Sequence, residues 1–199
     1  MNHYYTDNTN LESNITIFKY NYGGKELKFK SDNGVFSKER VDFGSNLLIN
    51  SLPELRDVKS VLDVGCGVGI LGICIKSKYK DVKLMMIDVN DRALNLAKEN
   101  TKLNGINDCV IVKSNLYENV NEKFDCIVSN PPIRAGKDIV HGVIVDGYNH
   151  LNIGGKIYVV IQKKQGAPSL EKKMMEVFGN VKTINKKNGY FIFEGVKNN

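Results

Sequence analysis

Short apolar runs alternate with amphipathic stretches along the chain from residue 60 onwards. Continuous, β-branched runs of this kind are typical of parallel strands that are covered on both faces of a sheet. They are SVLDVG, KLMMIDV, CVIVKS, FDCIVSN and KIYVVIQ. The pattern predicts an α/β domain in which five parallel strands are joined by helices.

The stretches between these runs have helical spacing. Residues 91–105 open on an acidic cap and end at Gly105, and they place Ala93, Leu94, Ala97 and Leu103 on one side. Residues 136–155 predict a second helix followed by glycines. Its apolar side consists of Ile139, Val140, Val143, Ile144, Tyr148 and Leu151.

Both ends of the chain carry a different pattern. After the helical stretch SLEKKMMEVFG, the segments VKTIN and YFIFEGV flank Asn188-Gly189, which predicts a β-hairpin. Ahead of residue 60, residues 15–34 alternate like a second hairpin, and FGSNLLINSLPEL predicts a short helix with Ser45 near its start. Since no linker or repeat interrupts the chain, we expect one domain over residues 1–199. Residues 1–55 would form a hairpin and helix extension, and residues 56–199 the core.

Composition places the chain among ordinary globular proteins. Of its 199 residues, 42% are hydrophobic and 25% charged. No apolar stretch has the ~18 residues of a membrane span, and MNHYYTDNTNLESN lacks the features of a signal peptide. We therefore expect a cytoplasmic protein without a membrane partner. The net charge of +6 suits an anionic partner such as RNA, although lysine runs such as QKKQ also occur on solvated faces.

The four cysteines stand singly among apolar residues, without the spacing of metal ligands or redox pairs. They are Cys66, Cys74, Cys109 and Cys126. Free cysteine in such a context behaves as a small hydrophobic residue. We expect all four to be reduced residues of the core, and we predict no metal site.

The first predicted strand runs into the glycine-rich segment LDVGCGVGILG. Gly65, Gly67 and Gly69 allow a sharp turn and a close approach of the backbone to a ligand before a helix begins. The loop is therefore a candidate nucleotide-cofactor site. Gly67, Gly69 and Gly72 also spell the pattern of dinucleotide-binding enzymes, so this loop alone leaves a nicotinamide-dependent oxidoreductase open.

Two aspartates refine the prediction. Asp63 lies at the end of the first strand, where burial is costly unless a partner compensates the charge. A cofactor that carries an ammonium and a sulfonium group would provide that partner. Asp88 ends the second strand and is placed to accept hydrogen bonds from both hydroxyls of a ribose. Alternatively, Asp88 caps the helix that follows it.

The segments VLDVGCGVG, IDVN and SNPPIRAG together resemble class I S-adenosylmethionine-dependent methyltransferases. The last is similar to the motif of the small-domain methyltransferases, which include ribosomal RNA small-subunit methyltransferase C. The resemblance extends from GVFSKERVDFGS to the C-terminus. It implies a Rossmann-like seven-stranded fold with a mostly parallel sheet, an antiparallel terminal hairpin and a small N-terminal hairpin extension.

The resemblance also implies a function: transfer of a methyl group from S-adenosylmethionine to the exocyclic amino group of a guanine in 16S rRNA. The partner would be ribosomal RNA or the small ribosomal subunit. The cofactor-binding residues implied are Asp63, Gly65, Cys66, Gly67, Gly69, Asp88, Val89, Asn115, Leu116 and Asn130. An acidic residue often takes the place of Asn115 near the adenine amino group, but an amide oxygen can also accept that bond. Asn115 could equally be a turn residue.

The segment Asn130-Pro131-Pro132-Ile133 is the candidate catalytic motif. An exocyclic base nitrogen is a poor nucleophile because its lone pair is delocalised into the ring. The side-chain oxygen of Asn130 and the carbonyl of Pro131 can each accept a hydrogen bond from the amino group, which leaves the lone pair aimed at the methyl carbon. The prolines fix φ and remove N–H donors, so the acceptors stay in place. The alternative is that the motif only ends a strand.

Ile133 departs from the family pattern, because amino-methyltransferases commonly have Tyr or Phe there to stack on the base. The residue that holds the base is therefore open, and Phe36 is our candidate. Arg134 and Lys137 follow the prolines and are candidate phosphate contacts.

Other functions remain open at this point. A glutamine or DNA-adenine amino-methyltransferase shares the Asn-Pro-Pro chemistry but usually keeps the aromatic residue, and such DNA enzymes usually need a target-recognition domain. A non-catalytic RNA-binding module would not need the intact cofactor loop. Carbon-5 methylation needs a cysteine nucleophile where Asn130 stands. Larger relatives carry two tandem copies of the domain, one of which has lost the cofactor loop, so a homodimer could supply the second surface.

Overall fold

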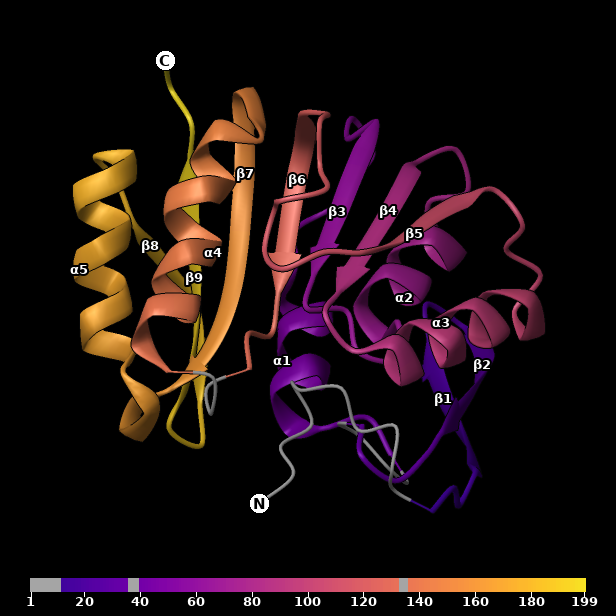
Figure 1. Ribbon diagram of the computed structural model, residues 1–199. Helices are drawn as coiled ribbons and strands as arrows, with labels where there is room; N and C mark the ends of the chain where they lie inside the picture. Colours follow the sequence, from indigo (N-terminus) through magenta and orange to yellow (C-terminus); the bar gives the residue numbers. More distant parts are fainter. Residues whose placement is uncertain (1–11, 36–39, 133–135) are drawn as a thin grey trace.

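The computed structural model describes residues 12–35, 40–132 and 136–199. Its main feature is a seven-stranded sheet with the order β5-β4-β3-β6-β7-β9-β8 (Figure 1). The parallel strands are β3 (Ser60–Val64), β4 (Lys83–Asp88), β5 (Cys109–Lys113), β6 (Phe124–Ser129) and β7 (Leu151–Gln162). β9 (Tyr190–Val196) is antiparallel to β7, and β8 (Lys182–Lys187) is antiparallel to β9. The predicted α/β methyltransferase fold is confirmed.

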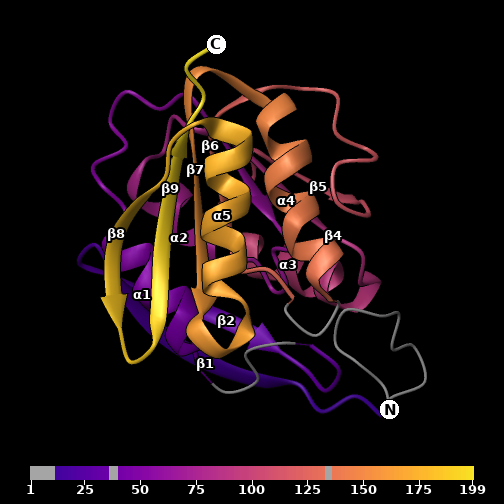
Figure 2. The same ribbon diagram turned by 90° about the vertical axis from the view of Figure 1, so that its left-hand side faces the viewer.

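Helices cover both faces of this sheet. One layer contains α1 (Phe43–Ser51), α2 (Ile70–Lys78) and α3 (Asp91–Leu103), and the other contains α4 (Lys137–Asn149) and α5 (Ala167–Phe178). Figure 2 shows α1 and α2 on one side of β7 and β9, with α4 and α5 on the other. Neighbouring residues of β3 pack into opposite layers, since Val61 and Leu62 are both fully buried in different clusters. This two-sided burial explains the continuous apolar runs of the sequence.

The second predicted helix ends earlier than expected. α4 stops at Asn149, and Leu151 is the first residue of β7 rather than a helical residue. Leu151 is fully buried and pairs with Phe124 of β6, and the register then shifts before Cys126 pairs with Lys156. Strand pairing and burial in the sheet therefore override the helical spacing of this leucine.

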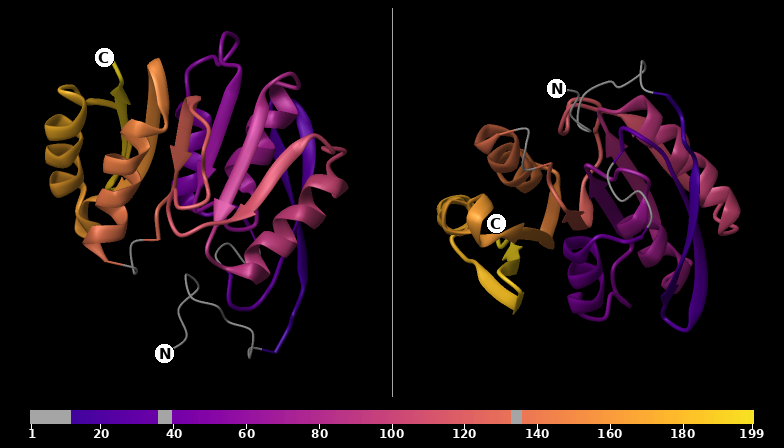
Figure 3. Two further views of the ribbon diagram at one scale, coloured as in Figure 1. Left: turned by 45° about the horizontal axis from the view of Figure 1, so that its top comes forward. Right: turned by 90° about the horizontal axis from the view of Figure 1, so that it is seen from below.

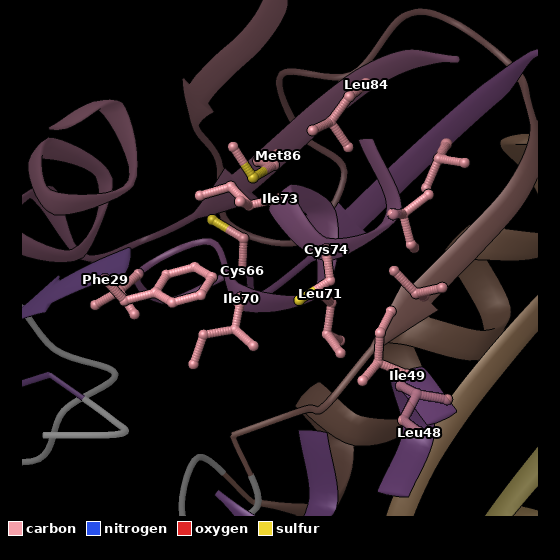
Figure 4. Packing of buried hydrophobic residues seen from close by; sticks show 14 of the residues in the cluster. Phe29, Leu48, Ile49, Cys66, Ile70, Leu71, Ile73, Cys74, Leu84 and Met86 are labelled. Atoms are coloured by element: carbon pink, nitrogen blue, oxygen red, sulfur yellow. The ribbon is translucent and has the colours of Figure 1, made fainter. Parts of the chain in front are cut away.

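The predicted N-terminal hairpin consists of β1 (Thr16–Tyr22) and β2 (Lys25–Ser31). Gly23 and Gly24 occupy its turn with φ values of 58° and 78°. The amide side chains of Asn100 on α3 and of Asn104, which caps the C-terminal end of α3, each bond to both backbone groups of a β2 residue, at 2.7–3.0 Å. These side chains take the place of a neighbouring strand, so the hairpin is anchored to the core. Figure 4 shows Phe29 of β2 packed in the same cluster as Leu48 and Met86.

The terminal hairpin turns at Asn188 and Gly189, whose φ values of 50° and 76° match the predicted tight turn. Its tip is tied to the short helix η2 (Lys163–Gln165), because the Lys163 N–H donates to the Gly189 carbonyl at 2.7 Å. Gln162, the last residue of β7, pairs with Tyr190, the first residue of β9. Tyr190 therefore lies at the edge of the sheet where the parallel strands end, and the right-hand view of Figure 3 looks onto this edge. In the described part of the chain, no helix is both long and apolar enough to cross a bilayer.

Candidate active site

A cavity of about 710 Å³ lies at the carboxyl edge of the sheet. Parallel α/β sheets bind their ligands at this edge, because loops that follow neighbouring strands converge there. The cavity brings together most of the residues that the sequence singles out: Asp63, Gly65, Cys66, Gly67, Asp88, Val89, Asn115, Leu116, Asn130, Pro131 and Pro132. They follow or end β3, β4, β5 and β6, so four separate sequence segments form one site.

The glycine loop after β3 is held against β4. The backbone N–H groups of Gly65 and Cys66 both donate to the Ile87 carbonyl at 2.9 Å. Gly67 has a φ of 54°, and a Cβ added there would meet nothing within 4 Å. The loop backbone thus borders open space in which a ligand can approach closely.

Gly69 and Gly72 allow close packing of α2 against β4. Gly69 caps α2 with a φ of 90°, and a Cβ there would lie 3.1 Å from Ile73. A Cβ on Gly72 would lie 2.7 Å from the sulfur of Met86. Neither glycine lines the cavity. They bring the start of α2 close to β4, which fixes the direction of the loop.

Asp63 has one carboxyl oxygen that the described residues leave unsatisfied. The side chain is fully buried, and Oδ2 accepts from the Gly72 N–H at 2.9 Å, whereas Oδ1 has no hydrogen-bond partner within the described ranges. Burial raises the pKa of this carboxyl to about 7, and the charge of Asp88 adds to the effect. A buried oxygen in this state favours a cationic ligand. Because Asp63 lines the cavity, the site fits the ammonium and sulfonium groups of S-adenosylmethionine.

Asp88 holds the glycine loop and faces the same cavity. Its Oδ2 accepts from the Gly67 N–H at 2.8 Å, and its Oδ1 accepts from the Asn90 N–H at 2.9 Å. Burial raises the pKa of Asp88. Each carboxylate oxygen can accept a further hydrogen bond, so ribose hydroxyls remain suitable partners. The alternative that Asp88 caps α3 is wrong, because Asn90 is the cap and accepts from the Ala93 N–H at 3.1 Å.

The loop after β5 forms another wall of the cavity. Asn115 is exposed, and its Nδ2 donates to Glu118 at 2.8 Å, so its oxygen is the remaining side-chain group for an adenine. Leu116 has a φ of 50°, which is rare for a residue other than glycine. Its carbonyl accepts from the Ser114 hydroxyl at 2.8 Å. A Cβ on Gly142 of α4 would come within 2.4 Å of the Leu116 side chain, so this glycine makes room for the leucine.

Asn130 is oriented by α1. Its Nδ2 donates to Ser45 Oγ at 2.9 Å and to Asp42 Oδ1 at 3.1 Å. The same Asp42 oxygen caps α1 by accepting from the Ser45 N–H at 2.9 Å. Because a carboxylate can only accept, the amide nitrogen of Asn130 must face Asp42, and the amide oxygen takes the opposite side. Helix capping and the orientation of Asn130 therefore depend on one carboxylate.

Several lining residues were not predicted. Asp42, Ser45, Gln165 and Tyr190 all line the cavity, although no motif in the sequence assigns them to the site. For Asp42, the available signal was its position as a cap directly before the predicted helix at 43–55. Tyr190 and Gln165 come from the terminal hairpin and η2, and no local pattern indicates that these segments reach the site.

Besides Gly69, four predicted residues are not among the cavity-lining residues above: three are not described by the structure, and one is exposed on the surface. Phe36, Ile133 and Arg134 fall outside the described residues. Lys137 is the exposed first residue of α4 and does not line the cavity.

The cysteines are free, as expected, and Cys66, Cys74 and Cys126 are buried. Burial raises the pKa of Cys126 to about 12 and also raises the pKa of Cys66. Thiols in this environment stay protonated and are not nucleophiles. The site therefore lacks the thiolate that carbon-5 methylation requires.

The family of the chain is shown by comparison with known proteins. Residues 26–194 match the methyltransferase small domain family. The chain belongs to this family. The methyltransferase predicted from the three motifs is thus confirmed, and the nicotinamide-dependent oxidoreductase is excluded.

Two known proteins are similar to the chain over different shares of their own length. The chain is 45% identical over 197 residues to the uncharacterized protein YbxB of Bacillus subtilis, covering 98% of both chains. It is 33% identical over 173 residues to ribosomal RNA small subunit methyltransferase C of Photobacterium profundum, covering 85% of this chain and 50% of the relative. The chain spans about half the length of that relative.

A solved structure has the same fold. The T. thermophilus 16S rRNA guanine-N2 methyltransferase, in complex with AdoMet and guanosine, superposes with a TM-score of 0.81 and 24% identity. The match covers 92% of this chain and 50% of that chain.

Proposed function

We propose that this protein is an S-adenosylmethionine-dependent methyltransferase that modifies the exocyclic amino group of a guanine in small-subunit ribosomal RNA. The observation that carries the proposal is the orientation of Asn130 by Ser45 and Asp42 at the edge of a cofactor-sized cavity. An amide held in this way presents an acceptor oxygen to an amino group. Methyl transfer to that amino group then needs no strong base.

The cofactor half of the site is formed by three strand ends. S-adenosylmethionine supplies an electrophilic methyl group on a sulfonium sulfur. Asp63 offers to the cationic methionine end the oxygen that has no hydrogen-bond partner among the described residues, and Asp88 offers acceptors to the ribose. Asn115 offers its amide oxygen to the adenine amino group. These three acceptor groups therefore match the charged and the polar parts of this cofactor.

The other half of the site presents the nucleophile. Asn130 Oδ1 and the Pro131 carbonyl accept the two hydrogens of the amino group, which turns its lone pair towards the methyl donor. Such positioning can lower a barrier by roughly 7–11 kcal/mol. Once methylated, the nitrogen is cationic and acidic, so its extra proton can leave to water.

The choice of ribosomal RNA rests on relatives and on charge. Both the P. profundum relative and the T. thermophilus structure are named for methylation of small-subunit rRNA. Exposed lysines also flank the two lining residues Gln165 and Tyr190: Lys163 and Lys164 precede Gln165, and Lys187 is paired with Tyr190 across the terminal hairpin. A negatively charged polynucleotide fits these surroundings.

The decisive experiment compares rRNA nucleosides from a deletion strain with those from the parent by mass spectrometry. We expect loss of one N2-methylguanosine, restored by the wild-type gene but not by Asn130→Ala. Unchanged rRNA, or loss of a methyl group from a protein glutamine or from adenine in DNA, would refute the proposed substrate. Because those substrates share the Asn-Pro-Pro chemistry, the purified protein should be assayed on all of them with labelled cofactor.

A further inference from the structure

An aromatic ring lies beside Asn130 although the sequence has Ile133 after the prolines. The ring belongs to Tyr190, which lines the cavity together with Asn130. We propose that Tyr190, supported by Phe43, is the stacking platform for the base that is methylated. This inference rests on the proposed function and names the residue that holds its substrate.

Tyr190 reaches the site because of the antiparallel terminal strand. It is the first residue of β9 and pairs with Gln162, the last residue of β7. Figure 1 shows the β8–β9 turn and α1 on the side to which the arrowheads of β3, β4 and β6 point. A chain segment 60 residues beyond Asn130 thus returns to the edge where the cofactor loops converge.

The glycine at position 44 shows how close the ring lies to Asn130. A Cβ added to Gly44 would lie 3.4 Å from Asn130 Nδ2 and 3.4 Å from Tyr190 Cε1. One methyl group would therefore contact both side chains. Because Asn130 and Tyr190 also line the same cavity, a base that bonds to Asn130 would share that cavity with the tyrosine ring.

The ring is supported by Phe43. The Phe43 ring lies 5.1 Å from the Tyr190 ring between centroids, with an angle of 49° between the planes. The hairpin is tied to α1 by a 2.7 Å hydrogen bond from Asn185 Nδ2 to Ser51 Oγ. A ring that is preorganised in this way loses little conformational freedom when a base stacks on it.

The surroundings of Tyr190 also suit a nucleotide. Lys187 is its direct cross-strand partner, and paired residues project from the same face of a sheet. The exposed Lys187 is therefore positioned to contact a phosphate next to a base that stacks on Tyr190. An aromatic ring and an adjacent lysine are a common combination in proteins that bind unpaired nucleotides.

The test replaces the ring without leaving a large cavity. Tyr190→Leu should raise the KM for rRNA roughly 10-fold or more, since stacking on a base is lost, while cofactor affinity and melting temperature stay close to wild type. Tyr190→Phe keeps the ring and should stay near wild type. Phe191→Leu is the matched control, because Phe191 packs against the opposite layer of the molecule and should leave the KM unchanged.

A direct readout complements the kinetics. The ring proton resonances of Tyr190, assigned with Tyr190→Phe, should shift when guanosine is added together with S-adenosylhomocysteine. Wild-type KM in Tyr190→Leu, or unmoved ring resonances, would refute the role of Tyr190 while leaving the methyltransferase intact. Absence of methyl transfer to rRNA by the wild-type protein would instead refute the proposed function, and this inference with it.

Discussion

Asn130 and Ser45 are 85 residues apart in the sequence, yet the amide nitrogen of one lies 2.9 Å from the hydroxyl oxygen of the other. Ser45→Ala removes one of the two acceptors that orient the amide. A hydrogen bond of this kind has a net value of about 0.5–1.5 kcal/mol, so we expect kcat to fall roughly 2- to 10-fold. Cofactor affinity, measured by calorimetry, should not change.

Ser129→Ala is a suitable control for this prediction. Ser129 immediately precedes Asn130, is fully buried and donates to the Val64 carbonyl at 2.8 Å. Both variants lose a buried hydroxyl, but only Ser45 contacts the Asn130 amide. An equal loss of kcat in the two variants would show that the effect comes from general destabilisation.

Gly44→Ala should separate stability from activity. Gly44 is a helical residue of α1, and replacing glycine by alanine at such a position can stabilise a protein by about 0.4–1 kcal/mol. The new Cβ, however, would lie 3.2 Å from Asp42 Oδ1 and 3.4 Å from Asn130 and Tyr190. We expect a melting temperature equal to or above wild type and a loss of methyl transfer of roughly 10-fold. Full activity in a stable variant would show that the gap at Gly44 is not needed.

The sequence predicts the cofactor half of the site well because its signals are local. Each strand end is marked by a β-branched run, and Asp63, Gly67 and Asp88 lie within or directly after those runs. Once the strands are parallel, their ends must converge. The error at Leu151 has the opposite cause, since helical spacing continued by chance across the start of β7.

The substrate half depends on contacts between distant segments. Asp42 bonds to Asn130, and Tyr190 lines the same cavity, because α1 and the terminal hairpin pack on the same edge of the sheet. No periodicity in the sequence specifies that packing. Self-association of the chain stays a prediction. Light scattering on the purified protein would test it.

Asp88 should contribute to cofactor binding both directly and through the glycine loop. Asp88→Ala removes the acceptors for the Gly67 and Asn90 N–H groups as well as those offered to the ribose. We expect calorimetry to show affinity for S-adenosylmethionine weakened by roughly 1–3 kcal/mol. Asp91→Ala is the control, because Asp91 begins α3 nearby but does not line the cavity. Equal weakening by both substitutions would contradict a specific role for Asp88.

Asp63 should make cofactor binding depend on pH. Its pKa is about 7 in the folded protein and 3.8 as the ordinary value, so between these pH values the folded protein holds a proton that the unfolded chain has lost. The stability that this carboxyl contributes is therefore present below pH 3.8 and lost as the pH rises to about 7. Without a ligand, the buried Asp63 side chain favours its protonated form. A bound cation instead favours the charged carboxylate. Cofactor binding should then release a proton below pH 7.

Calorimetry at several pH values tests this directly. Affinity for S-adenosylmethionine should increase by up to about 10-fold per pH unit and level off near pH 7, before its own amino group titrates at about 7.7–8.0. Asp63→Asn should flatten this dependence and, without cofactor, melt at a higher temperature than wild type at alkaline pH. A pH dependence that survives in Asp63→Asn would assign the proton to another group.

Substrate size and salt should affect methyl transfer together. If Tyr190 and Asn130 hold only the base, the remaining affinity must come from phosphates. Exposed candidates are Lys163 and Lys187, next to the lining residues Gln165 and Tyr190, and Lys137, two residues before the lining residue Ile139. We expect methyl transfer to rRNA or ribosomal subunits, almost none to guanosine monophosphate or a short oligonucleotide, and a steep loss as salt rises. Each lysine that contacts a phosphate should lower the slope of log affinity against log salt by about 0.7–0.9 when replaced by alanine. Lys172→Ala, on the exposed side of α5, should leave the slope unchanged. Transfer to the mononucleotide as fast as to rRNA, or indifference to salt, would show that the pocket recognises the base without help from the lysines.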